Sequence, residues 1–171
     1  FRPGDDPAAT TRIAEFNDLA SVEEALRHED VAVLLTEPFL TDGGFTLPLP
    51  GWHAGLRDLC TRYGTLLLLD ETHTQTSGPG GLTRKWGLDP DMFVIGKPIA
   101  GGVPAAAYGM SADVADRLGR AILANDVDVS GVGGTLTGNA LALAAIRATL
   151  SNCLREEDFA QMIPLAGAWA E

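Results

Sequence analysis

Two short runs of apolar residues limit the possible folds more than any other feature of the sequence. They span residues 31–36 and 66–69, and neither alternates polar with apolar side chains. Such runs are typical of strands that are covered on both faces, as in a parallel sheet. The pattern also predicts strands at 12–17, 92–95 and 105–108 and helices at 21–29, 52–63, 112–123, 139–150 and from 156 onwards. Strands that alternate with helices indicate βαβ units, so we expect an α/β fold with a mainly parallel sheet.

Local signals predict where some of these elements begin and end. Ser21, followed three residues later by Glu24, is typical of a capping box at a helix start. Gly64 stands where the helix at 52–63 should end. Gly-rich and Pro-rich stretches are interpreted as loops, at 40–51, 74–90 and 126–138.

The charge balance and the cysteine count exclude several classes of function. Acidic residues outnumber basic ones by 23 to 12, a net charge of −11. This excess argues against binding to nucleic acid or to an anionic membrane surface, because both need clustered Lys and Arg. No apolar run approaches the roughly 18 residues that cross a bilayer. Cys60 and Cys153 are too few for a disulfide framework, so a reducing, cytoplasmic setting is expected. The histidines lack partners at ligand spacing, so no metal site is predicted.

Polar residues follow the predicted strands at the points where the carboxyl ends of a parallel sheet would meet. They are Glu37, the pair Asp70 and Glu71, and Lys97. Asp70 alone could cap a neighbouring helix, or with Glu71 it could form the Walker-B acids that hold Mg²⁺ in an ATPase. The ATPase alternative needs a phosphate loop of the form G-x-x-x-x-G-K-[ST], and this sequence contains none.

Lys97 is one of only two lysines, the other being Lys85 in a predicted exposed turn. It directly follows an apolar strand, so we expect a partly desolvated and therefore nucleophilic amine, with a lysine that extends into solvent as the simpler alternative. Combined with Asp70, 27 positions earlier, the lysine indicates a pyridoxal-phosphate site. In such a site the lysine carries the aldehyde of the cofactor, and the carboxylate pairs with the protonated pyridine nitrogen.

Six motifs, in this order and at these approximate spacings, closely resemble the class III pyridoxal-phosphate aminotransferases. The similarity is strongest to the branch that contains glutamate-1-semialdehyde aminomutase and β-amino-acid transaminases, and it extends from about Phe16 to Leu150. The motifs are Thr36-Glu37-Pro38, Leu56–Cys60, Leu68–Thr74, Asp89-Pro90-Asp91, Gly96–Pro104 and Gly134–Asn139.

The resemblance implies a role for each of several side chains. Lys97 would be the Schiff-base lysine and would move the proton between substrate and cofactor. Asp70 would bind the pyridine nitrogen, and Thr72 would pack on the ring where relatives have Val or Ile. His73 stands where relatives have Gln or Met, either near the phenolic oxygen of the cofactor or in a supporting position behind that contact. Thr135 would contact the cofactor phosphate, usually across a homodimer interface.

The remaining implications concern Glu37, the substrate contact and the extent of the chain. Glu37 is expected to be structural. Gln75 replaces the usual Gly after the Asp-Glu motif and a nearby Arg is absent, which leaves the contact to the substrate carboxylate undefined. The substrate class is an amino acid or an amino ketone, and the reaction is either amino transfer or 2,1-aminomutation.

Relatives in this family are longer, so the chain is expected to be incomplete at both ends. Residues 1–155 would form the C-terminal half of a fold-type-I large domain, and 156–171 would begin the small domain. As a fragment it should expose apolar faces and be inactive alone. A catalytically inactive scaffold with the same fold is the alternative to an enzyme.

Overall fold

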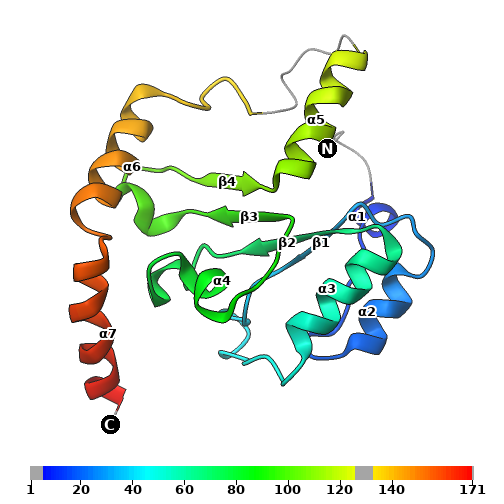
Figure 1. The fold of residues 1–171 in the computed structure, drawn as a ribbon, viewed down its shortest axis with the longest axis horizontal. Helices are drawn as coiled ribbons and strands as arrows, with labels where there is room; N and C mark the ends of the chain where they lie inside the picture. Colours follow the sequence, from blue (N-terminus) through cyan, green and yellow to red (C-terminus); the bar gives the residue numbers. More distant parts are fainter. Residues whose placement is uncertain (1–5, 126–132, 171) are drawn as a thin grey trace.

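The computed structural model describes residues 6–125 and 133–170, and a four-stranded sheet lies at its centre (Figure 1). The strands are β1 (Val33–Thr36), β2 (Leu66–Asp70), β3 (Met92–Ile95) and β4 (Ala107–Met110), and they lie side by side in that order. The β1–β2 and β2–β3 pairs are parallel, whereas β3 and β4 are antiparallel. The expected α/β fold with a mainly parallel sheet is therefore confirmed.

Helices connect and flank these strands. The α-helices are α1 (Pro7–Thr10), α2 (Leu19–Leu26), α3 (Trp52–Tyr63), α4 (Gly81–Trp86), α5 (Ala112–Asn125), α6 (Ala140–Asn152) and α7 (Glu156–Ala170), and the short 3₁₀ helices are η1 (Thr74–Ser77) and η2 (Lys97–Ala100). α2 and α3 lie side by side next to the sheet, α6 packs against η2, and α7 extends away from the sheet (Figure 1). None of the helices in the described ranges is long and apolar enough to cross a membrane.

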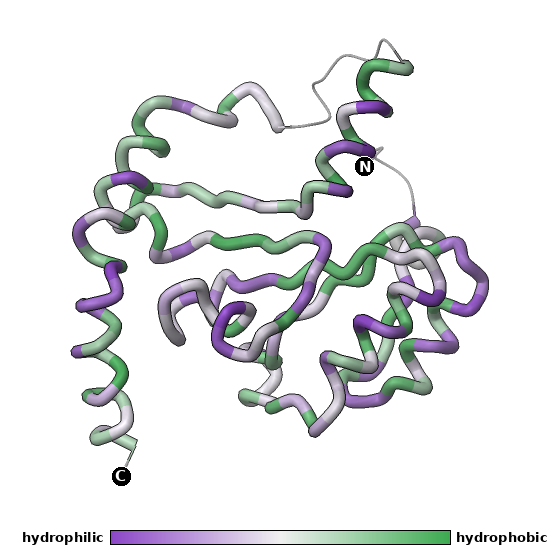
Figure 2. Tube along the Cα trace, in the orientation of Figure 1, coloured by the Kyte–Doolittle hydropathy of each residue, from purple (hydrophilic) through white to green (hydrophobic). Residues whose placement is uncertain are grey.

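The core lies between β2 and the pair α2 and α3. Its buried side chains are Val22, Leu26, Trp52, Leu56, Leu59, Cys60, Leu67 and Leu69. Figure 2 shows hydrophobic colour concentrated along β1, β2 and β3. Because α2 and α3 place their apolar residues at helical spacing, one face of each helix meets the alternate residues of β2 that point the same way.

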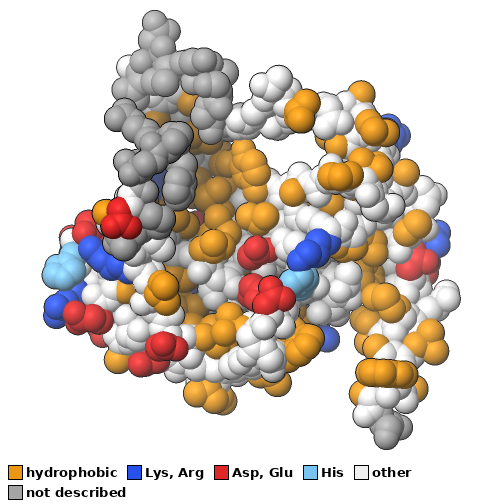
Figure 3. Space-filling model, turned by 180° about the vertical axis from the view of Figure 1, so that it is seen from behind, with side chains coloured by type: hydrophobic (Ala, Val, Ile, Leu, Met, Phe, Trp, Pro, Cys, Tyr) orange, Lys and Arg blue, Asp and Glu red, His pale blue; other side chains and the backbone are white. Residues whose placement is uncertain are grey.

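The expectation that both apolar strands are covered on both faces is wrong for β1. Val33 is 43% exposed and Leu35 is 64% exposed, so solvent reaches this side of β1 in the part of the chain that the structure describes. Further apolar side chains are exposed along α7, where Trp169 is 90% exposed, and Figure 3 shows hydrophobic side chains along this helix. Phe45, Leu123 and Leu141 are also more than 60% exposed, so the described part of the chain presents apolar surface at several places, as predicted.

The N-terminal strand and the first helix start differ from the prediction. Residues 11–17 form no strand in the structure. The cap of α2 is Asp18, whose Oδ1 accepts hydrogen bonds from the N–H groups of Ala20 and Ser21 at 3.0 and 3.1 Å. Ser21 Oγ instead accepts from Glu15 N at 3.0 Å. Asp and Ser are both good cap residues, and the helix begins at the earlier of the two. Gly64 ends α3 as predicted, with a left-handed φ of 66°.

The predicted loop at 74–90 contains η1 and α4, and a buried carboxylate organises both. Glu71 is 3% exposed, and its oxygens accept from Thr74 Oγ1, Leu82 N and Thr83 N. The last two N–H groups belong to the first turn of α4, where a negative charge is favourable. Because these contacts occupy the Glu71 carboxylate, this side chain is a structural cap and does not match a free Walker-B acid.

Gly81 lies against this carboxylate, which yields a stability prediction. Its φ is +65°, and a Cβ there would lie 2.6 Å from Glu71 Oε2, whereas Gly87 has a φ of +63° and open space. We expect Gly81→Ala to lower the free energy of unfolding by about 1–3 kcal/mol more than Gly87→Ala, because it adds overpacking to the shared backbone strain. Urea unfolding of the complete gene product measures both. Equal losses of unfolding free energy in the two variants would show that a Cβ at Gly81 does not crowd the Glu71 carboxylate.

The two cysteines should react at different rates. Cys60 lies in the core and burial raises the pKa of its thiol to about 11, whereas Cys153 is exposed. Since the thiolate is the reactive form, we expect iodoacetamide at pH 8 to alkylate Cys153 in the folded protein and Cys60 only after unfolding. Peptide mass spectrometry measures both sites in one sample, and equal rates would show that the core opens readily.

Candidate active site at the carboxyl ends of the parallel strands

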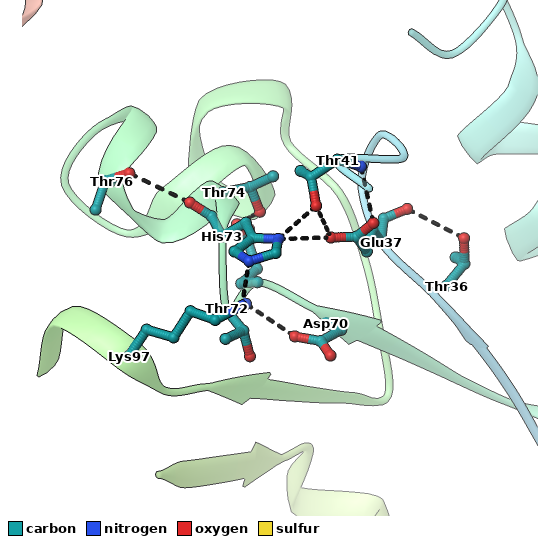
Figure 4. Close-up of polar contacts among 10 residues, drawn as sticks. Thr36, Glu37, Thr41, Asp70, Thr72, His73, Thr74, Thr76 and Lys97 are labelled. Carbon is teal, nitrogen blue, oxygen red and sulfur yellow. Dashed lines mark hydrogen bonds and ion pairs between the residues drawn. The ribbon is translucent and has the colours of Figure 1, made fainter. Parts of the chain in front are cut away.

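The predicted strand-end residues lie together at one edge of the sheet (Figure 4). Glu37 directly follows β1, Asp70 is the last residue of β2, and Lys97 comes two residues after β3. The strands are parallel, so their carboxyl ends meet, and the register pairs Asp70 with Val94 of β3. The turn after Asp70 is tied to β3 because Glu71 N donates to Val94 O at 2.8 Å. This turn carries Thr72 and His73 to the same edge.

Lys97 has an unusual backbone and an accessible side chain. It starts η2 with a φ of +47°, in the left-handed region that side-chain-bearing residues rarely adopt. Its Nζ contacts Nε2 of His73. The side chain is exposed, so the predicted partial desolvation is wrong for the described chain. Lys97 lies beyond the end of β3, at the start of η2, where Gly96 and Ile99 are buried but the Lys97 side chain is not.

His73 connects Lys97 to the end of β1. Its Nδ1 contacts Thr41 Oγ1 and lies 3.5 Å from Glu37 Oε1. Thr41 in turn donates from Oγ1 to Glu37 Oε1 at 2.6 Å and from its backbone N–H to Glu37 Oε2 at 2.9 Å. The structure therefore assembles a continuous chain of contacts from Glu37 through Thr41 and His73 to Lys97.

The pattern of the sequence located only part of this chain of contacts. Glu37 was expected to be structural, and it does support a neighbour, since its carboxylate binds Thr41 and faces His73. Thr41 was missed, because it lies in a Gly-rich and Pro-rich stretch without periodicity. Its spacing of four residues from a strand-end carboxylate was the one available indication.

Asp70 and Thr72 lie beside Lys97 on the neighbouring strand end. Asp70 is half-buried, and its Oδ1 accepts from Thr72 N at 2.8 Å. Its Oδ2 has no hydrogen-bond partner among the described residues. The Thr72 methyl group lies 3.6 Å from the position that a Cβ on Gly96 would take, so it packs against the residue before Lys97. One carboxylate oxygen, one methyl group and one amine thus lie along two adjacent strand ends.

Thr135 stands apart from the other predicted site residues. It is exposed in a turn where Thr137 N donates to Gly134 O at 2.9 Å and Gly134 N donates to Thr137 Oγ1 at 2.7 Å. No hydrogen bond within the described ranges joins it to Asp70, His73 or Lys97. Residues 126–132, which precede this turn in the sequence, lie outside the described residues. Among the residues that the structure describes, no group of three or more His, Cys, Asp or Glu is placed to hold a metal ion.

Comparison with known proteins identifies similar sequences. The model of the family described as aminotransferase class-III matches residues 5–169. Glutamate-1-semialdehyde 2,1-aminomutase from Nitratidesulfovibrio vulgaris is 40% identical over 159 residues, which cover 90% of this chain and 36% of that protein. The enzyme of the same name from Roseiflexus castenholzii is 42% identical and covers 84% of this chain and 32% of its own length. The chain thus spans about a third of the curated relatives that it matches.

Solved structures show the same similarity. A glutamate-1-semialdehyde aminomutase (K286A) from Pseudomonas aeruginosa in complex with PMP superposes with a TM-score of 0.87 at 46% identity, covering 98% of this chain and 39% of that one. A β-phenylalanine aminotransferase from Variovorax paradoxus gives a TM-score of 0.73 at 30% identity, covering 86% and 34%. These neighbours confirm the predicted fold-type-I architecture.

The backbone of Lys97 yields a testable consequence. A left-handed φ costs a side-chain-bearing residue about 1–2 kcal/mol, so Lys97→Gly should be more stable than Lys97→Ala by about 1 kcal/mol. Both variants remove the contact to His73, which leaves the strain as their difference. The matched pair at Lys85, in α4, should show the reverse order because Gly destabilises a helix. Thermal unfolding measures all four variants, and a more stable Lys97→Ala would contradict the strain.

Proposed function

The chain belongs to the class III aminotransferases, and on that premise we propose that the protein carrying it is a pyridoxal-phosphate enzyme that transfers an amino group. The reaction is either transfer between two molecules or a 2,1-aminomutation. The observation that carries this proposal is the exposed Lys97 amine beside the open carboxylate oxygen of Asp70, on adjacent strand ends. Because the chain spans a third of its relatives, the activity is proposed for the complete gene product.

The side chains at the sheet edge suit the cofactor. Pyridoxal phosphate supplies an aldehyde that links to an amine and a ring that withdraws electrons from the reacting carbon. Asp70 has its Oδ2 available to hold a protonated ring nitrogen, while the bond from Thr72 N fixes the carboxylate through Oδ1. The Thr72 methyl group offers an apolar contact to one face of a ring. Lys97 reaches the same region with an amine that solvent can approach.

Each of the predicted site residues Lys97, Asp70 and Thr135 has a separate role in this proposal. Lys97 attaches the cofactor and, when released, its Nζ holds and moves the proton at the substrate carbon. Asp70 keeps the ring nitrogen protonated, which requires its carboxylate to stay ionised. Thr135 contacts the phosphate from the partner subunit of a homodimer, which accounts for its distance from the other residues. The substrate is a small amino acid or amino ketone.

The proposal also includes the division of the chain and its cellular setting. Residues 1–155 contribute to the cofactor-binding large domain, and 156–171 begin the small domain. Free thiols at Cys60 and Cys153 fit a reducing, cytoplasmic setting. A catalytically inactive scaffold would need neither the open oxygen of Asp70 nor the strained Lys97, so we favour the enzyme. The ATPase alternative is disfavoured because the Glu71 carboxylate is already bound by three donors.

Cofactor attachment tests the proposal directly. After incubation with pyridoxal phosphate and borohydride reduction, we expect the complete gene product to carry the cofactor on the peptide containing Lys97. Lys97→Ala should carry none, and Lys85→Ala should behave as the wild type. Peptide mass spectrometry and the absorbance of the cofactor are the measurements. Cofactor fixed elsewhere in Lys97→Ala would overturn the assignment.

Asp70 should affect the rate of amino transfer more than attachment. We expect Asp70→Asn to retain borohydride-fixed cofactor while kcat falls by about 10²–10³, the range seen when one electrostatic stabiliser of a transition state is removed. A panel of α-amino acids, β-amino acids and amino ketones, assayed with the wild type, identifies the substrate class. An unchanged kcat in Asp70→Asn would mean that this carboxylate does not act on the ring nitrogen.

A further inference from the structure

The hydrogen bonds of Thr41 determine where the protons of this network lie. A hydroxyl group has one proton to donate. Thr41 Oγ1 is 2.6 Å from Glu37 Oε1, and an ionised carboxylate can only accept, so the Thr41 proton points to Glu37. The same Oγ1 also contacts His73 Nδ1. In that second contact Thr41 can act only as the acceptor.

This arrangement selects one form of the His73 ring. Since Thr41 accepts from Nδ1, the proton of the neutral imidazole lies on Nδ1, and Glu37 Oε1 at 3.5 Å favours the same position. The other ring nitrogen, Nε2, then carries a lone pair. Nε2 is the atom that contacts Lys97 Nζ. A basic nitrogen of fixed orientation therefore faces the amine (Figure 4).

We propose that His73 is the proton acceptor for Lys97, and that Thr41 and Glu37 are positioning residues that hold His73 with Nε2 free. The inference rests on the proposed function, in which the Lys97 ammonium must lose a proton before its nitrogen can attack the aldehyde of the cofactor. In the step itself one N–H bond of the Lys97 ammonium breaks and an N–H bond forms at His73 Nε2. The result is a neutral amine with a free electron pair and an imidazolium, and no other reactant is needed.

The charges around His73 suit this transfer. Once His73 is protonated, both ring nitrogens are donors, and Nδ1 then donates towards Thr41 and the Glu37 carboxylate. Glu37 is fixed by two bonds from Thr41 and is half-buried, so its negative charge is screened less than that of an exposed carboxylate. The backbone of Lys97 is strained, with a positive φ. Strain of this kind is found where the direction of a side chain is needed for function.

The reactivity of Lys97 towards an acylating reagent tests the proposal, because acylation requires the Lys97 nitrogen to lose a proton, which His73 would accept. The complete gene product, freed of cofactor, is treated at pH 7 with a trace of N-hydroxysuccinimide acetate, and initial rates at Lys97 and Lys85 are measured by peptide mass spectrometry. Lys85 is exposed in α4 and serves as the internal reference. We expect His73→Gln, which can still accept a hydrogen bond but cannot take the proton, to lower the Lys97-to-Lys85 ratio by about tenfold, corresponding to about 1.4 kcal/mol.

Variants of Thr41 test the positioning role separately. Thr41→Val removes the acceptor for Nδ1 and should lower the ratio, whereas Thr41→Ser restores the hydroxyl and should restore the ratio. Thr76→Val is the matched control, because Thr76 Oγ1 bonds only the main-chain carbonyl of His73, at 3.2 Å. A His73→Gln ratio within about twofold of the wild type would overturn the role of His73. An unchanged ratio in Thr41→Val would overturn the role of Thr41 and Glu37.

The experiment distinguishes this inference from the proposed function. If pyridoxal phosphate does not attach to Lys97 in the wild type, the proposed function fails, but the acylation ratios still show whether His73 takes the proton. If the cofactor attaches and the ratios do not depend on His73, the proposed function stands and the proton acceptor is refuted. When both hold, we expect the rate of cofactor attachment to fall in His73→Gln in parallel with the acylation ratio.

Discussion

The buried carboxylate of Glu71 is the interaction on which the rest of the site depends. A charge removed from water is stable only when donors surround it, and Glu71 collects one hydroxyl and two backbone N–H groups from a segment that follows it. These bonds close the chain after β2 into a compact turn with η1 and α4. Asp70 directly precedes Glu71 and His73 follows it by two residues, so the turn that satisfies the buried charge also orients these two polar side chains.

Much of the fold was predictable because it depends on local patterns. Continuous apolar runs predicted β1 and β2, and helical spacing together with Gly64 predicted α3. The start of α2 and the contents of 74–90 were not predictable in the same way. Asp18 and Ser21 are both competent caps, and choosing between them depends on tertiary contacts. α4 is short and lacks a strong periodic pattern, and it forms because Glu71 binds its first turn.

The candidate site was also predictable only where local patterns determine it. Asp70 and Lys97 were found because a polar residue at the end of an apolar strand is visible in the sequence and because parallel strand ends converge. The contact between Thr41 and His73 joins residues 32 positions apart, with α3 and β2 between them in the sequence. The exposure of Lys97 also depends on what lies beyond the sheet edge, which no local pattern reports. The placement of these side chains at the strand ends was therefore predictable from the sequence, whereas the contacts among Glu37, Thr41 and His73 required the fold.

The antiparallel pairing of β3 and β4 places Lys97 in the connection between the two strands of one hairpin. A parallel connection would leave the sheet edge through a crossover helix, whereas here the chain returns directly along β3, with Ile95 opposite Ala107. The backbone around Lys97 is thus closed by the short connection from β3 to β4, at low loop entropy, and α6 packs against η2 within that connection. The position of the Lys97 backbone therefore depends on β3, β4 and α6 together, so a displacement of α6 would be transmitted to the lysine through η2.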